Sequence, residues 1–324
     1  MVDDVAHRDI VLIMRHAFRF AHFSDPHLPL LPGWPVRLRN LAGKRLLGFL
    51  SWRRKRHKVH QPDVLAALLA DVAAHAPDHI TVTGDLINIA LPDEFDRART
   101  WLERLGPPDR VSVVPGNHDA TVAVPWDIGL GQWQPWMTGD ESAPQSASSF
   151  PFVRVRGPVA FIGISTAVPS PPLLAIGTVG ARQAARLEEV LHDLARQDVF
   201  RVVLMHHPPM RVHGSERKAL TDRQRFQEVL ARAGAELVLH GHHHRDHVGY
   251  LPGLGGAVIP VIGVPSASAA PVGRAQPARW IQFTVERQDA GCWRLAVLVR
   301  GYETGGFRTE ARFAIGYGGR DDVS

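Results

Sequence analysis

Short apolar runs and amphipathic helical patterns alternate along residues 18–240. The runs are five to seven residues long, and between them apolar residues recur every three or four positions. We predict strands at residues 18–23, 79–83, 110–114, 159–165, 200–205 and 236–240. We predict helices at residues 62–75, 92–105, 181–196 and 221–233. Strands and helices that alternate in this way are typical of an α/β layered fold.

The C-terminal part of the chain has a different pattern. Residues 257–314 alternate strand-like runs with glycine turns and show no helical periodicity. We predict that they form a second sheet that completes the same domain. The chain has 324 residues, of which 45% are hydrophobic, so it is long enough for one large globular domain. We expect residues 1–15 to be a disordered extension and residues 16–324 to be a single domain.

Residues 34–60 interrupt the regular pattern with a basic insertion. It contains nine Lys or Arg residues and no acid, with leucine, phenylalanine and tryptophan residues interleaved. This pattern is typical of a basic amphipathic helix. One interpretation is a lid that contacts an anionic membrane through residues 37–58 and receives an amphiphilic phosphate ester. A second is a helix packed on the domain with a solvated basic face, and a third is a nucleic-acid contact.

Charge and cysteine content bear on the possible partners of the protein and on its cellular compartment. The formal net charge is +5, which permits anionic partners such as phosphates. The single cysteine, Cys292, cannot form an intrachain disulfide, and this favours a reducing compartment. No apolar run reaches the ~18 residues of a spanning helix. We therefore expect a cytoplasmic protein that could lie against the inner face of the membrane.

Residues with metal-binding side chains follow the predicted strands one after another. They are Asp25, His27, Asp85, Asn117, His118, His206, His242 and His244. In α/β sheets, ligands bind just beyond the carboxyl ends of the strands, so these side chains are expected at one edge. Imidazole and carboxylate together suit borderline divalent metals. Their number fits two metal ions that share one bridging carboxylate.

Five short motifs occur in one order along the chain. They are DPH at 25–27, GD at 84–85, GNHD at 116–119, HHP at 206–208 and GHHH at 241–244. This set resembles the five blocks of the calcineurin-like metallophosphoesterase superfamily. The resemblance implies a four-layer αββα sandwich, in which two mixed β-sheets are flanked by helices. It also implies a cofactor of two divalent metal ions, such as Mn, Fe, Zn or Co.

The resemblance implies a role for each motif residue. The first metal ion is held by Asp25, His27 and His244, Asp85 bridges, and the second is held by Asn117, His206 and His242. His118 is expected to protonate the leaving group or to stabilise the transition state. Asp119 is expected to orient His118. His207 either contacts the substrate phosphate or has a packing role.

The second motif favours one branch of the superfamily. The protein phosphatase branch has an arginine that grips a phosphomonoester in this block, whereas this chain reads GDLIN. The sequence is similar to class III phosphodiesterases, which implies hydrolysis of a phosphodiester by in-line attack of metal-bound hydroxide. The main alternative is a UDP-diacylglucosamine-type pyrophosphate hydrolase acting on a membrane lipid. A nuclease and a non-catalytic scaffold are further alternatives.

Overall fold

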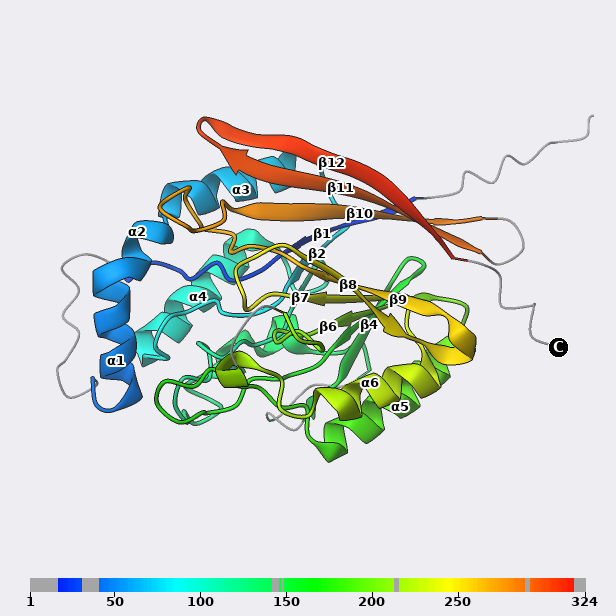
Figure 1. Ribbon diagram of the computed structural model, residues 1–324, viewed down its shortest axis with the longest axis horizontal. Helices are drawn as coiled ribbons and strands as arrows, with labels where there is room; N and C mark the ends of the chain where they lie inside the picture. Colours follow the sequence, from blue (N-terminus) through cyan, green and yellow to red (C-terminus); the bar gives the residue numbers. More distant parts are fainter. Residues whose placement is uncertain are drawn as a thin grey trace, which may run out of the picture.

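Two six-stranded mixed sheets lie face to face at the centre of the molecule (Figure 1). This computed structural model describes residues 17–30, 41–141, 146, 149–212, 216–288 and 292–317. The first sheet has the order β12-β11-β10-β1-β2-β3. Its strands are β1 (Phe18–Phe23), β2 (His79–Val82), β3 (Val111–Val113), β10 (Arg279–Arg287), β11 (Trp293–Glu303) and β12 (Gly306–Tyr317).

The second sheet has the order β4-β5-β6-β7-β9-β8. Its strands are β4 (Phe152–Arg156), β5 (Val159–Gly163), β6 (Phe200–Leu204), β7 (Leu237–His240), β8 (His247–Pro252) and β9 (Val258–Gly263). The longer helices are α1 (Lys44–Ser51), α3 (Pro62–Ala74), α4 (Pro92–Leu105), α5 (Ala181–Ala195) and α6 (Arg223–Ala233). Shorter turns are η2 (Trp52–Arg56), α2 (His57–Val59), η3 (Leu130–Met137), η5 (Glu216–Lys218) and η6 (Leu254–Gly256).

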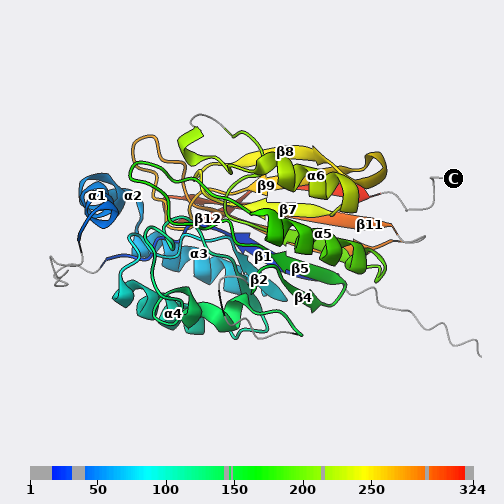
Figure 2. The same cartoon turned by 90° about the horizontal axis from the view of Figure 1, so that it is seen from below.

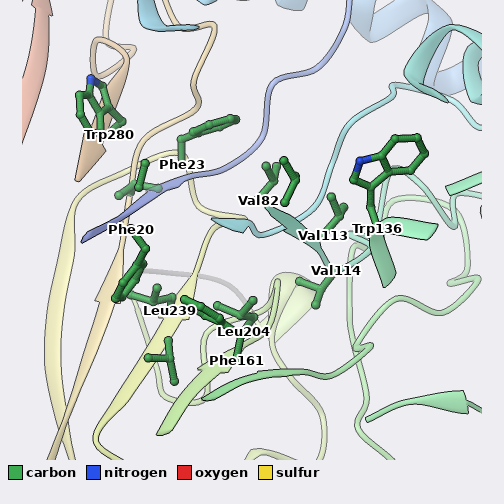
Figure 3. Packing of buried hydrophobic residues seen from close by; sticks show 14 of the residues in the cluster. Phe20, Phe23, Val82, Val113, Val114, Trp136, Phe161, Leu204, Leu239 and Trp280 are labelled. Atoms are coloured by element: carbon green, nitrogen blue, oxygen red, sulfur yellow. The ribbon is translucent and has the colours of Figure 1, made fainter. Parts of the chain in front are cut away.

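Alternating side chains in β1 explain why this strand is covered on both faces. Phe20 points into the space between the sheets, where it packs edge-on against Phe161 of β5 with ring centroids 5.1 Å apart (Figure 3). Phe23 packs on the opposite face against Trp101 of α4. Successive side chains of a strand point to opposite faces, so a strand between a sheet and a helix layer must be apolar on both. Strand β6 is covered in the same way, with Leu204 between the sheets and Val203 under the α5–α6 layer.

The helices form the two outer layers of the sandwich. α3 and α4 share an apolar core with the first sheet, and α5 and α6 lie against the second sheet (Figures 1 and 2). Pro62 begins α3 at a position where its missing N–H costs no hydrogen bond. The predicted fold class, a four-layer αββα sandwich, is confirmed. No helix in the described part of the chain is long and apolar enough to cross a membrane.

The prediction that residues 257–314 form a second sheet is wrong, because their strands are divided between the two sheets. β9 joins the second sheet beside β7, whereas β10 pairs antiparallel with β1 and extends the first sheet through β11 and β12. A strand's neighbours are set by hydrogen bonds across the sheet, and the apolar pattern does not specify them. The predicted extension of residues 1–15 lies outside the described residues.

Candidate metal centre

The loops after β1, β2, β3, β6 and β7 converge at one edge of the two sheets. β1, β2 and β3 are parallel neighbours in the first sheet, and β6 and β7 are parallel neighbours in the second. Backbone hydrogen bonds join the loops after β1 and β2. Asp25 N–H donates to the carbonyl oxygen of Gly84, and His27 N–H donates to the backbone carbonyl oxygen of Asp85. The predicted convergence of ligand-type residues at the carboxyl ends of the strands therefore holds for these loops.

Five of the predicted ligands have a left-handed backbone conformation. The φ angles are 53° at Asp25, 42° at His27, 55° at Asp85, 76° at His242 and 52° at His244. They make up five of the nine non-glycine residues with positive φ in the described chain. Such conformations cost of order 1–3 kcal/mol each and persist where the surroundings impose them. Their concentration in these loops makes this edge the candidate functional site.

The glycine before Asp85 is required by close backbone approach. Gly84 has a φ of 93°, and a Cβ atom there would lie 2.6 Å from the backbone nitrogen of Gly116 and 2.8 Å from the His206 ring. Any larger residue would separate the second and third ligand loops. The glycine of the GD motif is therefore a packing requirement of the site.

The first group of donor atoms comes from Asp25, His27, Asp85 and His244. Their ligand atoms all lie within 4.8 Å of one another. The Nε2 atoms of His27 and His244 are 3.0 Å apart, and His244 Nε2 is 3.1 Å from Asp25 Oδ1. Two imidazole nitrogens and two carboxylates that face one point form a donor set that suits a divalent cation.

The second group comes from Asp85, His206 and His242, again within 4.8 Å. Asn117 belongs beside it, because its Oδ1 atom is 3.1 Å from His206 Nε2. Asp85 takes part in both groups, with its Oδ2 atom 3.3 Å from His206 Nε2 and 3.9 Å from His27 Nε2. A carboxylate shared in this way could bridge two neighbouring metal ions.

Backbone carbonyls hold the rings of two candidate ligands, His206 and His242, in place. The carbonyl of Thr83 lies 2.7 Å from His206 Nδ1, and the carbonyl of Lys218 lies 2.9 Å from His242 Nε2. Each carbonyl accepts a hydrogen bond from the ring N–H, so the other ring nitrogen faces the donor group, where a metal ion would take the place of any proton it carries. His206 would thus coordinate through Nε2 and His242 through Nδ1.

The charge of His206 keeps Asp85 ionised. Burial by itself would raise the pKa of Asp85, but the charge of His206 and the hydrogen bonds from His206 and from the His118 backbone N–H outweigh it and lower the pKa below its usual range. Burial lowers the pKa of His206, and Asp85 reverses this and raises it to about 9. The carboxylate is therefore in the state that a bridging ligand needs.

His118 lies at the edge of both groups without belonging to either. Its backbone N–H donates to Asp85 Oδ1 at 2.7 Å, and its ring Nδ1 lies 2.6 Å from the carbonyl oxygen of Asn88. That carbonyl accepts the Nδ1–H hydrogen bond and leaves Nε2 for a ligand. Burial and the positive charge of Arg56 lower the pKa of His118 to about 3.

Asp119 does not contact the His118 ring, in contrast to the predicted orienting role. Its Oδ2 atom accepts hydrogen bonds from the backbone N–H groups of Asp85 and Gly116, and its Oδ1 accepts one from Ile87. The carboxylate therefore holds the second and third ligand loops together. Burial and the charge of Asp85 raise the pKa of Asp119 to about 8.

His207 is fully buried, which favours the packing role over substrate contact. Its Nδ1 atom is 2.7 Å from the Thr166 hydroxyl and its Nε2 atom is 3.2 Å from the Ala175 carbonyl. Both ring nitrogens thus have protein partners. The ring lies against His242 with centroids 4.3 Å apart and so supports that ligand.

Three site residues were missed by the sequence motifs. His60 forms a donor group with His27 and His244, and its Nδ1 atom is held 3.0 Å from the Ser268 hydroxyl. Arg56 lies beside His118 and His27, and Asn88 orients His118 through its backbone. Arg56 and His60 lie in the basic insertion, where no motif distinguishes them from the surrounding cations.

Four of the candidate ligands, Asp85, Asn117, His242 and His244, line a pocket of about 480 Å³, a volume suited to a small organic ligand. Its wall carries the cations Lys55, Arg56, Lys218, Arg245 and Arg274. Asp85 is the one carboxylate among its described lining residues. Such a pocket favours an anionic ligand.

Comparison with known proteins agrees with this chemistry. The family model for calcineurin-like phosphoesterases matches residues 18–246. A Synechococcus protein named as a probable cyclic nucleotide phosphodiesterase is 24% identical over 232 residues, which cover 71% of this chain and 79% of that protein.

Solved structures share the fold at low sequence identity. A purple acid phosphatase from yellow lupin (Lupinus luteus) seeds has a TM-score of 0.59 and 14% identity, over 93% of this chain and 54% of that one. A dimetal phosphatase from Danio rerio has a TM-score of 0.56 and 15% identity, over 90% of this chain and 98% of that one. The chain therefore belongs to the calcineurin-like phosphoesterase family and is a metal-dependent phosphoric ester hydrolase.

Proposed function

We propose that the protein hydrolyses a phosphodiester at a centre of two divalent metal ions bridged by Asp85. The observation that carries this proposal is the pair of donor groups that share one carboxylate, with His118 at their edge. The first ion would be held by Asp25, His27 and His244, and the second by Asn117, His206 and His242. Mn, Fe, Zn and Co all accept such ligands.

Two bound metal ions would make water nucleophilic near neutral pH and would neutralise charge on the phosphate. His118 would donate a proton to the oxygen atom that leaves when the P–O bond breaks. Its Nδ1–H is bound to the Asn88 carbonyl, so the transferred proton must come from Nε2. The negative charge of a bound phosphate would favour the protonated form of the His118 ring. It would thus oppose the effect of Arg56, which lowers the pKa of His118.

The preference for a diester is supported by the Synechococcus relative, whose name includes phosphodiesterase. The second motif lacks an arginine, but this absence is weaker support for a diester preference than the sequence suggested. The reason is that Arg56, from another segment, brings a guanidinium group to the site. A diester carries one negative charge, and a monoester carries up to two.

We expect manganese-loaded protein to hydrolyse bis(p-nitrophenyl) phosphate with a higher kcat/KM than p-nitrophenyl phosphate. The measurement is release of p-nitrophenol over a range of substrate concentrations. An Asp85→Asn variant purified in parallel reports contaminating phosphatases. A preference for the monoester would contradict the phosphodiesterase proposal.

A second candidate is an ester carried on a membrane lipid, as in a UDP-diacylglucosamine-type pyrophosphate hydrolase. α1 exposes Leu46, Leu47 and Leu50, with relative exposures of 42%, 44% and 37%. The exposed cations Arg53 and Arg54 follow on η2, and no acid occurs between residues 34 and 60. Apolar and basic side chains together suit the surface of an anionic bilayer, which in a cytoplasmic protein would be the inner face of the membrane.

If the substrate is carried on a membrane lipid, the protein should cosediment with vesicles that contain phosphatidylglycerol and not with vesicles of phosphatidylcholine alone. Replacing Leu46, Leu47 and Leu50 together by serine should remove most of the binding, since each leucine loses its apolar contact with the bilayer. The control replaces Leu173 and Leu254, which are exposed elsewhere. Equal binding of the triple variant and the wild type would argue against a membrane contact through α1.

A further inference from the structure

The described part of the basic insertion, residues 41–60, is anchored to the ligand loops. Arg45 donates hydrogen bonds to the carbonyl oxygens of Ile89 and Ala90, at 3.3 and 2.6 Å. Phe49 and Trp52 pack against a small apolar cluster that includes Ile89. A Cβ atom at Gly48 would lie 2.6 Å from the Ile89 side chain, so a glycine lets α1 approach this loop. The segment is therefore held against the loop that contains Asn88.

A π turn links the anchored helix to the metal centre. η2, at Trp52–Arg56, joins α1 to α2, and after α2 the hydrogen bond between His60 and Ser268 fixes the far end. A π turn has more residues per turn than an α-helix, so it changes the direction of the side chains that follow. Such turns occur often at functional sites. Here Arg56, the last residue of η2, lines the pocket.

Arg56 has histidines as neighbours rather than a carboxylate. Its Nη1 atom is 3.2 Å from His118 Nδ1 and its Nη2 atom is 2.9 Å from His27 Nδ1. Among the carboxylates of the described residues, none forms an ion pair with it. Burial lowers the pKa of Arg56, and the more distant charges of Asp85, Glu94 and Asp25 oppose this change.

These neighbours leave the guanidinium without suitable acceptors. It carries only hydrogen-bond donors. His118 Nδ1 already donates to the Asn88 carbonyl. His27 Nδ1 lies 3.3 Å from the Ile87 carbonyl, to which it would donate if its Nε2 atom bound a metal ion. If Asp25 and Asp85 coordinated metal ions, the positive charge of those ions would also cancel the favourable interaction of the two carboxylates with Arg56. A partly buried cation beside two metal ions then needs an anion, and the planar guanidinium fork matches two oxygen atoms of a phosphate.

We propose that Arg56, supplied by the basic insertion, donates hydrogen bonds to the non-bridging oxygen atoms of the scissile phosphate. The proposal rests on the phosphoesterase function proposed above. Arg56 then contacts the substrate and supplies from another segment the cationic grip that the second motif lacks. The basic insertion is on this account a wall of the active site, and Lys55 beside Arg56 extends the same cationic wall.

The test is inorganic phosphate binding to manganese-loaded protein, measured by isothermal titration calorimetry. We expect Arg56→Ala to weaken phosphate binding about tenfold or more, because a charge-assisted bidentate contact is lost. Arg56→Lys should restore part of it, since lysine keeps the charge without the fork. The matched control is Arg53→Ala, one turn earlier and exposed, which should bind phosphate as the wild type does. For a small diester, kcat/KM of Arg56→Ala should fall about 10²-fold.

Two results would overturn the proposal. Unchanged phosphate binding with a lower kcat/KM would mean that Arg56 acts through His118 and does not contact the phosphate. Loss of manganese in both Arg56 variants would mean that Arg56 supports the metal centre. If wild-type protein binds phosphate but cleaves no ester, the proposed function fails, while the binding comparison still decides the role of Arg56.

Discussion

Replacing Asp85 by asparagine is expected to remove bound metal and to lower turnover by at least about 10³-fold. Asp85 is the one carboxylate that belongs to both donor groups, so the change affects both metal positions at once. Metal ions contribute several kcal/mol of charge stabilisation to the transition state, and each 1.36 kcal/mol corresponds to about tenfold in rate. Asparagine keeps an Oδ1 acceptor for the His118 backbone N–H, so the loop geometry should survive.

Metal content by inductively coupled plasma mass spectrometry and hydrolysis of a small diester measure this effect. The control is Asp96→Asn, an exposed aspartate on α4, which should keep both metal and activity. Unfolding midpoints from circular dichroism establish that both variants fold. Two metal ions per chain in Asp85→Asn, together with normal turnover, would exclude Asp85 as the bridging ligand.

Replacing His118 by alanine is expected to keep the metals and to lower kcat by about 10²–10⁴-fold, the range of general acid–base groups. The ring of His118 lies outside both donor groups, and its contact with Asp85 is made by the backbone N–H, which alanine retains. The loss should therefore fall on the chemical step and not on metal binding.

The leaving group distinguishes an acid from a charge stabiliser. A protonated His118 helps an alkoxide to leave much more than a p-nitrophenolate, because the alkoxide is far more basic. The defect of His118→Ala should thus be larger for an alkyl ester than for a p-nitrophenyl ester. The control is His192→Ala on the exposed side of α5. An equal defect for both esters would rule out proton donation and leave only electrostatic stabilisation.

The order of elements could be predicted from the sequence because periodicity and turn residues are local signals. The predicted bounds of α4 agree with the structure at both ends, and the predicted helix 181–196 differs from α5 by one residue. The motif residues could also be found, since each follows an apolar run. Strand pairing could not be predicted, because β1 gains β10 as a neighbour through hydrogen bonds between residues more than 250 positions apart, such as the pair Phe20 and Phe283.

The sequence by itself determined the family resemblance, the fold class and the residues that can bind metals, since these follow from residue type and spacing. Tertiary structure alone decided which side chains meet. It gives Asp119 three backbone partners, buries His207, and brings Arg56 from a distant basic segment to His118. The physical reason is that contact depends on how the anchored helix and the π turn pack in space. Among nine similar cations, no local pattern marks the one that reaches the site.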